Sequence, residues 1–305
     1  MTLLRLASAS EGSAILAAED DFTRALGSFD RSFRMRTNAP VDDATLRRFL
    51  GEQAMDFTAE EAAVWEEAIA AVARGVQGMA GVLPPAVLIV KTTGREERDH
   101  AYTRANAIVL PAARVRSLRG ERAFRLLAHE LFHVASRASP ALRDATYALL
   151  GFAPIGPLTP PPELDDKRMT NPDAHALDHY LRLGERAFVP LLICPRPLAE
   201  VLEETSVLGV VRVTLLEIDP DAATIVRDAG GPVLVDAEAT EWSKRIARNS
   251  EYAIHPEEIL ADNLSLLVRR RLGAATPSAD LPFLAAFEEA LAASALGSGA
   301  VRSTS

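Results

Sequence analysis

Apolar residues recur at helical spacing through the first part of this chain. Trp65 and Ile69 lie four positions apart in an alanine-rich stretch, as expected for the buried face of a helix. Thr58 and Glu61, just before them, form a capping box that predicts where this helix begins. We therefore expect residues 1–82 to form an N-terminal helical segment that packs against, or supports, a site elsewhere in the chain.

The pattern changes after a pair of prolines at positions 84 and 85. Residues 86–90 and 106–110 are short apolar runs rich in β-branched side chains, which predict two buried strands. Residues 120–136 show a longer pattern that predicts a helix. An edge strand beside a functional site can bind an extended peptide by main-chain pairing, so we expect a substrate to lie antiparallel to residues 106–110. Residues 83–150 would then form the first part of the core.

The second half of the chain alternates between strand and helix patterns. Residues 151–237 combine a proline-rich loop with short β-branched runs separated by turns, which predicts a β-rich insertion. Residues 238–296 return to helical patterns, including a helix that opens at Pro256. The Gly- and Ser-containing end, residues 297–305, is expected to be a disordered tail. The predicted fold class is α+β, mainly helical, with a small edge sheet and this β-rich insertion.

Composition and charge narrow the classes of function. The 305 residues include 48% hydrophobic and 25% charged side chains, typical of a globular protein with a sizeable core. The net charge of −9 argues against a nucleic-acid or anionic-membrane partner. Cys194 is the only cysteine, which excludes an intrachain disulfide and a cysteine-based zinc site. With no apolar run long enough to span a membrane and no secretory signal at the start, we expect a cytoplasmic protein; its oligomeric state is not determined by the pattern.

The most specific motif is H-E-x-x-H at residues 129–133, inside the predicted helix. His129 and His133 are four positions apart, so both imidazoles project from one face and can bind one metal ion. Glu130 lies beside that ion, where it can take a proton from a bound water. Two histidines and a carboxylate are costly to bury on an apolar helix without partners, which favours a metal site over an ordinary core helix.

A catalytic zinc ion usually takes three protein ligands, so a third ligand is needed. The extension that would supply a histidine just downstream is absent, because Ser136 and Ser139 occupy its glycine and histidine positions. Glu258 and Asp262 form a better pair, since they are four positions apart on a predicted helix and project to one face. Glu258 can bind the metal, and Asp262 can accept the free N–H of a ligating histidine.

The residues around this pair have different expected roles. Asp262 is expected to accept the free N–H of His129 in particular, and so to fix the tautomer of that ring. Glu257 points about 100° away from its neighbour and is expected to be a solvated acid at the helix start. His255, three positions before the third ligand, and Tyr252 are candidate catalytic donors to the developing oxyanion.

The two motifs together resemble those of the gluzincin metallopeptidases, in which a helix with E-x-x-x-D follows the H-E-x-x-H helix. The form E-x-x-A-D at residues 258–262 is most similar to that of the integral-membrane prenyl-protein peptidases and their relatives, although no membrane segment accompanies it here. The resemblance covers these motifs and the strand order before them. It implies a zincin-like catalytic core with Zn²⁺ bound by His129, His133 and Glu258, and a β-rich insertion between the two metal-ligand helices.

A second polar cluster follows the proline-rich loop. Closely spaced Asp, His and Tyr side chains there suggest a wall of the site or a substrate contact, with an ordinary surface loop as the equal alternative. The possible substrate contacts are Asn106, Asp173, His175, His179 and Tyr180.

The expected function is that of a zinc metallopeptidase acting on a peptide or protein substrate. In this interpretation Glu130 takes the proton of the zinc-bound water and passes it to the leaving amine. Two alternatives remain open from the sequence. One is a metal-binding, proteolytically inactive protein that recognises a partner through its β-rich segment, and the other is a zinc hydrolase for a non-peptide bond.

Overall fold

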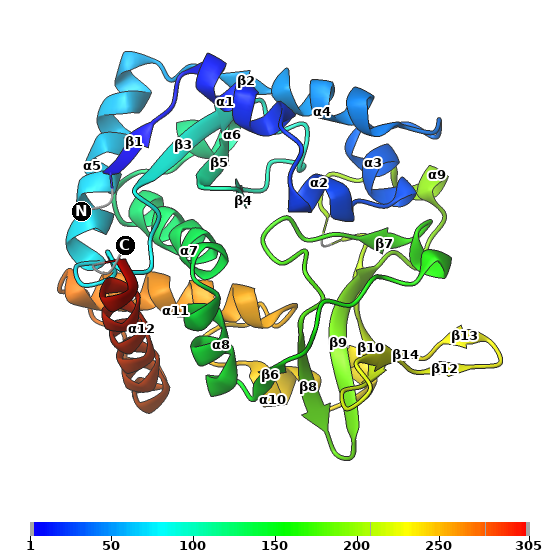
Figure 1. Cartoon of the computed structure of the whole chain (residues 1–305). Helices are drawn as coiled ribbons and strands as arrows, with labels where there is room; N and C mark the ends of the chain where they lie inside the picture. Colours follow the sequence, from blue (N-terminus) through cyan, green and yellow to red (C-terminus); the bar gives the residue numbers. More distant parts are fainter. Residues whose placement is uncertain (1–2, 208, 278, 303–305) are drawn as a thin grey trace.

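The computed structural model describes residues 3–207, 209–277 and 279–302. It has a mixed α+β fold, in agreement with the predicted class, with two main sheets and helices packed around them (Figure 1). The helices are α1 (Ala9–Ala17), α2 (Asp21–Ala25), α3 (Ser28–Arg34), α4 (Asp43–Gly51), α5 (Ala59–Gly75), α6 (Ala112–Ser117), α7 (Gly120–Ala138), α8 (Pro140–Leu149), α9 (Leu198–Val201), α10 (Trp242–Ile246), α11 (Pro256–Arg271) and α12 (Leu281–Arg302), with 3₁₀ turns η1 (Pro162–Leu164) and η2 (Ala237–Ala239).

A five-stranded sheet forms the upper part of the molecule in Figure 1. Its strands are β1 (Leu3–Leu6), β2 (Ala54–Met55), β3 (Ala86–Thr92), β4 (Tyr102–Arg104) and β5 (Ala107–Pro111). The order is β1-β3-β5-β4, and β2 pairs with β3. Strands β1, β3 and β5 are parallel, whereas β2 and β4 run antiparallel to their neighbours.

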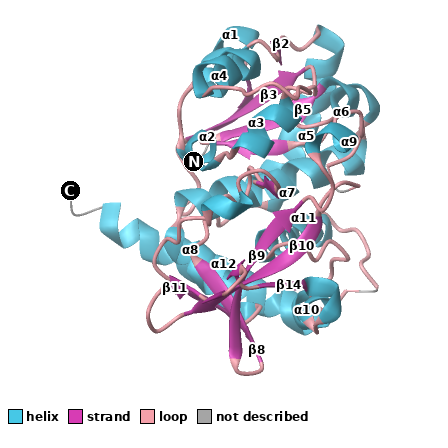
Figure 2. Ribbon diagram, turned by 90° about the vertical axis from the view of Figure 1, so that its right-hand side faces the viewer, coloured by secondary structure: helices cyan, strands magenta, loops and turns pink. Residues whose placement is uncertain are grey.

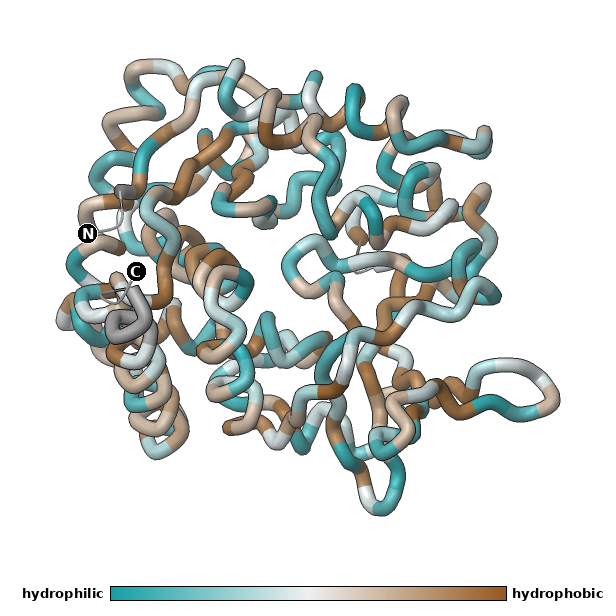
Figure 3. Tube along the Cα trace, viewed as in Figure 1, coloured by the Kyte–Doolittle hydropathy of each residue, from teal (hydrophilic) through white to brown (hydrophobic). Residues whose placement is uncertain are grey.

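Helices cover both faces of this first sheet, which makes its strands apolar on both sides. Val87 and Ile89 of β3 belong to the large core beneath the sheet, together with Trp65 of α5 and Leu127 of α7. The alternate residue Val90 belongs to a smaller core shared with α1 and α4. Figure 3 shows the result as apolar colouring along β3 and α7 at the centre of the molecule.

The second sheet contains seven strands and forms the lower right of Figure 1. It consists of β6 (Phe152–Pro154), β7 (Arg168–Met169), β8 (His179–Leu183), β9 (Arg186–Ile193), β10 (Arg212–Asp219), β11 (Thr224–Ile225) and β14 (Leu234–Asp236), and a separate hairpin joins β12 (Arg227–Asp228) to β13 (Gly231–Pro232). All of its pairings are antiparallel, in the order β11-β10-β9-β8-β6. Apart from this hairpin, the strands of the predicted β-rich segment therefore form one antiparallel sheet.

Helix α7 is the central element of the fold. It packs against α5, α8 and α11 and against strands β4 and β5. In the side view it passes between the two sheets (Figure 2). Leu127, Leu131 and Phe132 on its apolar face are fully buried in the large core. This packing fixes the helix, and with it the motif at 129–133, between two layers of structure.

Three expectations about the elements need correction. Strand β5 is not an edge strand, because β3 pairs with one side of it and β4 with the other. The N-terminal segment is not purely helical, since it supplies β1 and β2 to the first sheet. The expected tail at 297–305 begins too early, because α12 continues to Arg302; residues 303–305 lie outside the described part of the chain.

Strand β4 is another strand that local patterns did not reveal. It contains only three residues, and its neighbours in the sequence form a polar loop. Its pairing with β5 makes it the outer strand on this side of the first sheet. Among the described residues, no helix is both long enough and apolar enough to cross a membrane.

Candidate metal centre

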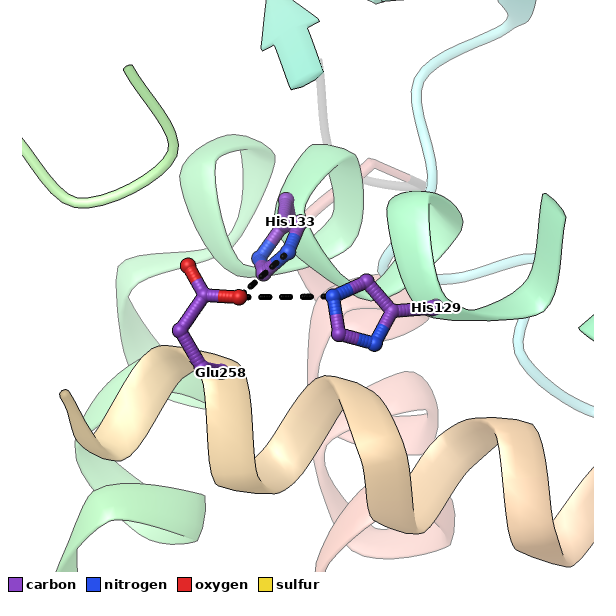
Figure 4. A group of neighbouring side chains, drawn as sticks. All are labelled: His129, His133 and Glu258. Carbon is purple, nitrogen blue, oxygen red and sulfur yellow. Dashed lines mark ion pairs between the residues drawn. The ribbon is translucent and has the colours of Figure 1, made fainter. Parts of the chain in front are cut away.

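Two helices bring the predicted metal ligands together. His129 and His133 project from one face of α7, and Glu258 projects from the first turn of α11 (Figure 4). Helix α11 begins at Pro256, whose fixed φ suits the first helical position, and the side chain of His255 accepts the N–H of Glu257 as a cap. The sequence therefore fixes where α11 starts, and the start places Glu258 opposite the two imidazoles.

The donor atoms meet at distances suited to a single ion. Oε2 of Glu258 lies 3.4 Å from Nε2 of His129 and 3.8 Å from Nε2 of His133. Ligands at about 2.0–2.2 Å in a tetrahedral site are roughly 3.4 Å apart, so these two separations are close to those that a shared ion requires. These three residues form one of two groups in the described chain that could hold a metal ion.

Each imidazole is oriented by a carboxylate on its other nitrogen. Nδ1 of His129 lies 3.0 Å from Asp262, as predicted, and Ser250 donates to the second oxygen of that carboxylate. Nδ1 of His133 lies 3.1 Å from Glu257. In each ring this contact leaves Nε2 free for a metal, which is the arrangement that fixes the tautomer of ligating histidines.

Glu257 is buried and structurally important, so the expectation of a solvated helix-start acid was wrong. Its side chain is 2% exposed. Besides facing His133 it accepts hydrogen bonds from Ser136 Oγ at 2.9 Å and Tyr147 Oη at 2.6 Å. Four polar groups from α7, α8 and α11 thus form one hydrogen-bonded cluster behind the metal donors.

The second oxygen of Glu258 is also held in place. Asn171 donates its side-chain N–H to Oε1 of Glu258 at 2.7 Å. This contact crosses from the loop after β7 to α11 and leaves Oε2 facing the histidines. The loop that the sequence marked as a polar cluster therefore contacts the site through Asn171 and its neighbour Asp173.

Glu130 is buried beside the donors with one oxygen unsatisfied. Its carboxylate is 3% exposed, and within the described residues Oε2 has no hydrogen-bond partner. It lies close to His133 and Asp173, the second group that could hold a metal. Burial, together with the negative charge of Asp173, raises the pKa of Glu130 to about 8. An unpaired buried carboxylate is costly, so this oxygen has the environment expected of a group that meets a water or a substrate.

The electrostatics of the donors favour positive charge at their centre. Burial opposes ionisation of Glu258, but His133 and His129 outweigh it and lower its pKa to about 2. Burial likewise opposes protonation of His133, but Asp173 and Glu258 outweigh it and raise its pKa to about 9. In the metal-free protein these carboxylates therefore hold protons on the imidazoles. A divalent cation can replace those protons, because ligation requires neutral histidine.

A cleft gives access to the centre. It has a volume of about 440 Å³ and is lined by His129, Glu130 and Glu258 together with Tyr252. A smaller adjoining cavity shares Tyr252 and Glu258 with it and includes Asp173. Of the two predicted oxyanion donors, Tyr252 and His255, Tyr252 is the one that lines this cleft. Burial raises the pKa of its phenol, which keeps the hydroxyl protonated and able to donate.

The loop between β3 and β4 forms one wall of both cavities through His100 and Ala101. Arg98 and Asp99 just before them have φ values of +53° and +60°, a backbone conformation that residues other than glycine rarely adopt. The guanidinium of Arg98 holds this backbone by donating to the carbonyl of Phe33 at 3.0 Å and lying 4.0 Å from its ring centroid. The wall is therefore fixed by a buried cation rather than left as a free loop.

His255 and His175 lie in a different place from the one predicted. Both line a separate cavity behind Glu257, together with Tyr147. Nδ1 of His255 is occupied as the cap of α11, and burial lowers its pKa to about 4. His255 is thus a neutral structural group at the start of α11, and the structure does not bring it to the cleft that contains Glu130.

The remaining expected substrate contacts are engaged elsewhere. Asn106 donates its side-chain N–H to the carbonyl of Ala86 and ties β5 to β3. His179 is 5% exposed, with Asp178 and Asp144 at its two ring nitrogens. Tyr180 packs on the outer core of the second sheet. These three side chains are explained by the fold.

Comparisons of the chain with protein-family models, with curated proteins and with solved structures each gave no match.

The roles of Glu257, Tyr147 and Asn171 were not predicted from the sequence. The position of Glu257 next to Glu258 could have indicated its role. Adjacent carboxylates on a helix that crosses α7 can face opposite nitrogens of one imidazole. No local pattern marks Tyr147, since it reaches the site only through the packing of α8 against α11.

Proposed function

We propose that this protein is a zinc metallopeptidase of gluzincin type. The observation that carries the proposal is the convergence of His129, His133 and Glu258 on one point, with the unsatisfied oxygen of Glu130 beside it. Two imidazoles and one carboxylate form a donor set that suits zinc and leaves a fourth position open. Asp262, Glu257 and Asn171 orient these three donors by hydrogen bonds. When bound, the ion polarises a carbonyl and lowers the pKa of a coordinated water.

Glu130 acts as general base in this proposal. It takes a proton from the attacking water and passes it to the nitrogen of the leaving amine. The burial that raises its pKa to about 8 supports both roles, because a base near neutral pH can accept a proton and release it again.

Tyr252 donates its hydroxyl hydrogen to the oxygen of the carbonyl under attack. It lines the cleft that contains His129 and Glu130 and the adjoining cavity that contains Asp173. A donor aimed at the developing oxyanion stabilises the transition state more than the ground state.

The outer edge of β4 replaces residues 106–110 as the surface for an extended substrate. Thr103 of β4 is already bonded, since its N–H donates to Asp173 at 2.8 Å. Ala101, two positions earlier, lines both cavities. A substrate strand would therefore pair with the chain at Ala101 and end its pairing before Thr103.

The test combines metal analysis with a peptide-library digest. Wild-type protein should bind about one zinc ion and cleave peptides. Glu130→Gln should keep the zinc and lose cleavage by at least about 10²-fold, because the proton acceptor is gone while the ligands remain.

Three results would contradict the proposal. Absence of zinc binding would remove the metal site as drawn. Cleavage by Glu130→Gln at the wild-type rate would remove the mechanism. Zinc binding by wild type without cleavage of any peptide would favour the partner-binding or non-peptide alternatives.

A further inference from the structure

A strongly basic segment leads into α7, the helix that carries His129 and His133, although the protein as a whole is acidic. Between residues 114 and 125 the chain contains arginines at 114, 116, 119, 122 and 125, whereas the whole protein has a net charge of −9. Three of these arginines, Arg114, Arg122 and Arg125, line the cleft with His129 and Glu130. Positive charge is therefore concentrated at one end of this cleft.

These arginines are not neutralised by the protein. Within the described residues, Arg122 and Arg125 form no ion pair and no side-chain hydrogen bond, and Arg114 donates only to the carbonyl of Asp99. Glu121, the one acid in this segment, pairs with Arg269 instead. Like charges held together without partners repel one another, so such a cluster is suited to an external anion.

The arginines lie in line with the metal donors. Positions 122, 125 and 129 are three and four residues apart and share one face of α7. At a rise of about 1.5 Å per residue, Arg125 and Arg122 lie roughly 6 and 10 Å along the helix axis from His129. An extended peptide advances about 3.3 Å per residue, so its side chains two to four positions from the cleaved bond would reach these guanidinium groups.

The cleft also contains acidic side chains. Glu130, Glu258 and Asp262 line the same cleft near the donors. Glu258 and Asp262 face the histidines, whereas Arg122 and Arg125 have no partner among the described residues, so these two arginines attract a carboxylate and set the direction in which an acidic ligand would lie.

We propose that the substrate carries one or more carboxylates two to four residues from the bond that is cleaved, and that Arg122 and Arg125 bind them, assisted by Arg114. This inference rests on the proposed peptidase function and adds the substrate class to it. The carboxylate can come from an Asp or Glu side chain or from the free C-terminus of a peptide.

The experiment measures binding separately from cleavage. Full-length Glu130→Gln protein is titrated into a fluorescently labelled peptide with three consecutive glutamates, and into the same peptide with glutamines. Each is made with a free and with an amidated C-terminus. The measurement is repeated in protein that also has Arg122→Gln and Arg125→Gln, and in a control with Arg116→Gln, an exposed arginine of the same segment outside the cleft.

The glutamate peptide should bind about tenfold more tightly than the glutamine peptide, since exposed ion pairs contribute modestly and two are engaged. The preference should weaken with salt, disappear in the double arginine variant and remain in the Arg116→Gln control. A preference confined to the free C-terminus assigns the carboxylate to the peptide end. Equal binding of both peptides, or equal loss in the Arg116→Gln control, would overturn the inference.

Cleavage by the protein with intact Glu130 separates the two proposals. Cleavage of both peptides at equal rates would overturn the arginine inference and leave the peptidase function standing. A clear binding preference without cleavage of either peptide would overturn the peptidase function and leave the assignment of Arg122 and Arg125 as an anion site.

Discussion

Oε1 of Glu257 lies 3.1 Å from Nδ1 of His133, on the opposite side of the ring from Glu258. Consecutive residues of α11 therefore face the two nitrogens of one imidazole. This is possible because α11 crosses α7 closely, so that the ring of His133 inserts between two side chains of the first turn. The second carboxylate has a defined task, which is to orient the ring and increase its basicity.

Replacing Glu257 should weaken metal binding without removing a ligand. Glu257→Gln keeps the size of the side chain but loses its charge, and we expect zinc affinity to fall about 10–100-fold. Competition with a fluorescent chelator measures this. Glu60→Gln, an exposed acid in the first turn of α5, is the matched control. Unchanged affinity in Glu257→Gln would show that the hydrogen bond to His133 has no part in metal binding.

Tyr252→Phe should separate catalysis from metal binding. Loss of one donor to a developing oxyanion costs about 10²–10³ in kcat, while the ligands are untouched. We expect normal zinc content and a low kcat for peptide cleavage. Tyr180→Phe, on the second sheet, should retain activity. A wild-type kcat in Tyr252→Phe would show that Tyr252 is not the donor to the oxyanion.

His255 should make the protein less stable in acid. Burial lowers its pKa to about 4, outweighing the nearby carboxylates of Glu257, Glu258 and Asp178. The folded state therefore binds the proton less readily than the unfolded state, whose histidine titrates near pH 6.5. Stability from this group is present above pH 6.5 and is lost as the pH falls toward 4.

His255→Asn tests this dependence, because asparagine still caps α11 but does not titrate. Urea unfolding of the metal-free protein at several pH values gives the free energy of unfolding. The slope between pH 4 and 6.5 should become shallower in the variant, by at most about 1.4 kcal/mol per pH unit. An unchanged slope would assign acid sensitivity to other groups.

Arg34 should be essential for stability. It is buried between Asp30 and Glu97, with contacts of 2.7 and 2.5 Å. Arg34→Leu leaves two buried carboxylates without their partner, and we expect a loss of about 3–5 kcal/mol in the free energy of unfolding. Arg24→Leu removes two exposed ion pairs, with Glu19 and Asp21, and should cost much less, because water screens both. Similar losses in both variants would contradict this account.

The sequence predicted those parts of the site that depend on spacing within one helix. His129 with His133 and Glu258 with Asp262 are each four positions apart, and a helix places such pairs on one face whatever surrounds it. The capping box at Thr58 was equally local and is present in the structure.

The parts that failed depend on which elements pack together. The interior position of β5 follows from its pairing with β4, and strand order is not written in the hydrophobic pattern of either strand. Glu257 was assigned to solvent because it points away from Glu258. That direction is covered by Tyr147 of α8, a helix whose place only the assembled fold reveals.

The two ligand helices are far apart in the chain, with the whole second sheet inserted between His133 and Glu258. An ion bound by both helices would therefore act as a cross-link that closes a very long loop. Closing a long loop removes much of the freedom of the unfolded chain, as a disulfide does. Resistance of the β-rich segment to proteolysis would then increase when metal is bound and decrease when it is removed. The single cysteine of the chain cannot form an intrachain disulfide that would serve as another cross-link.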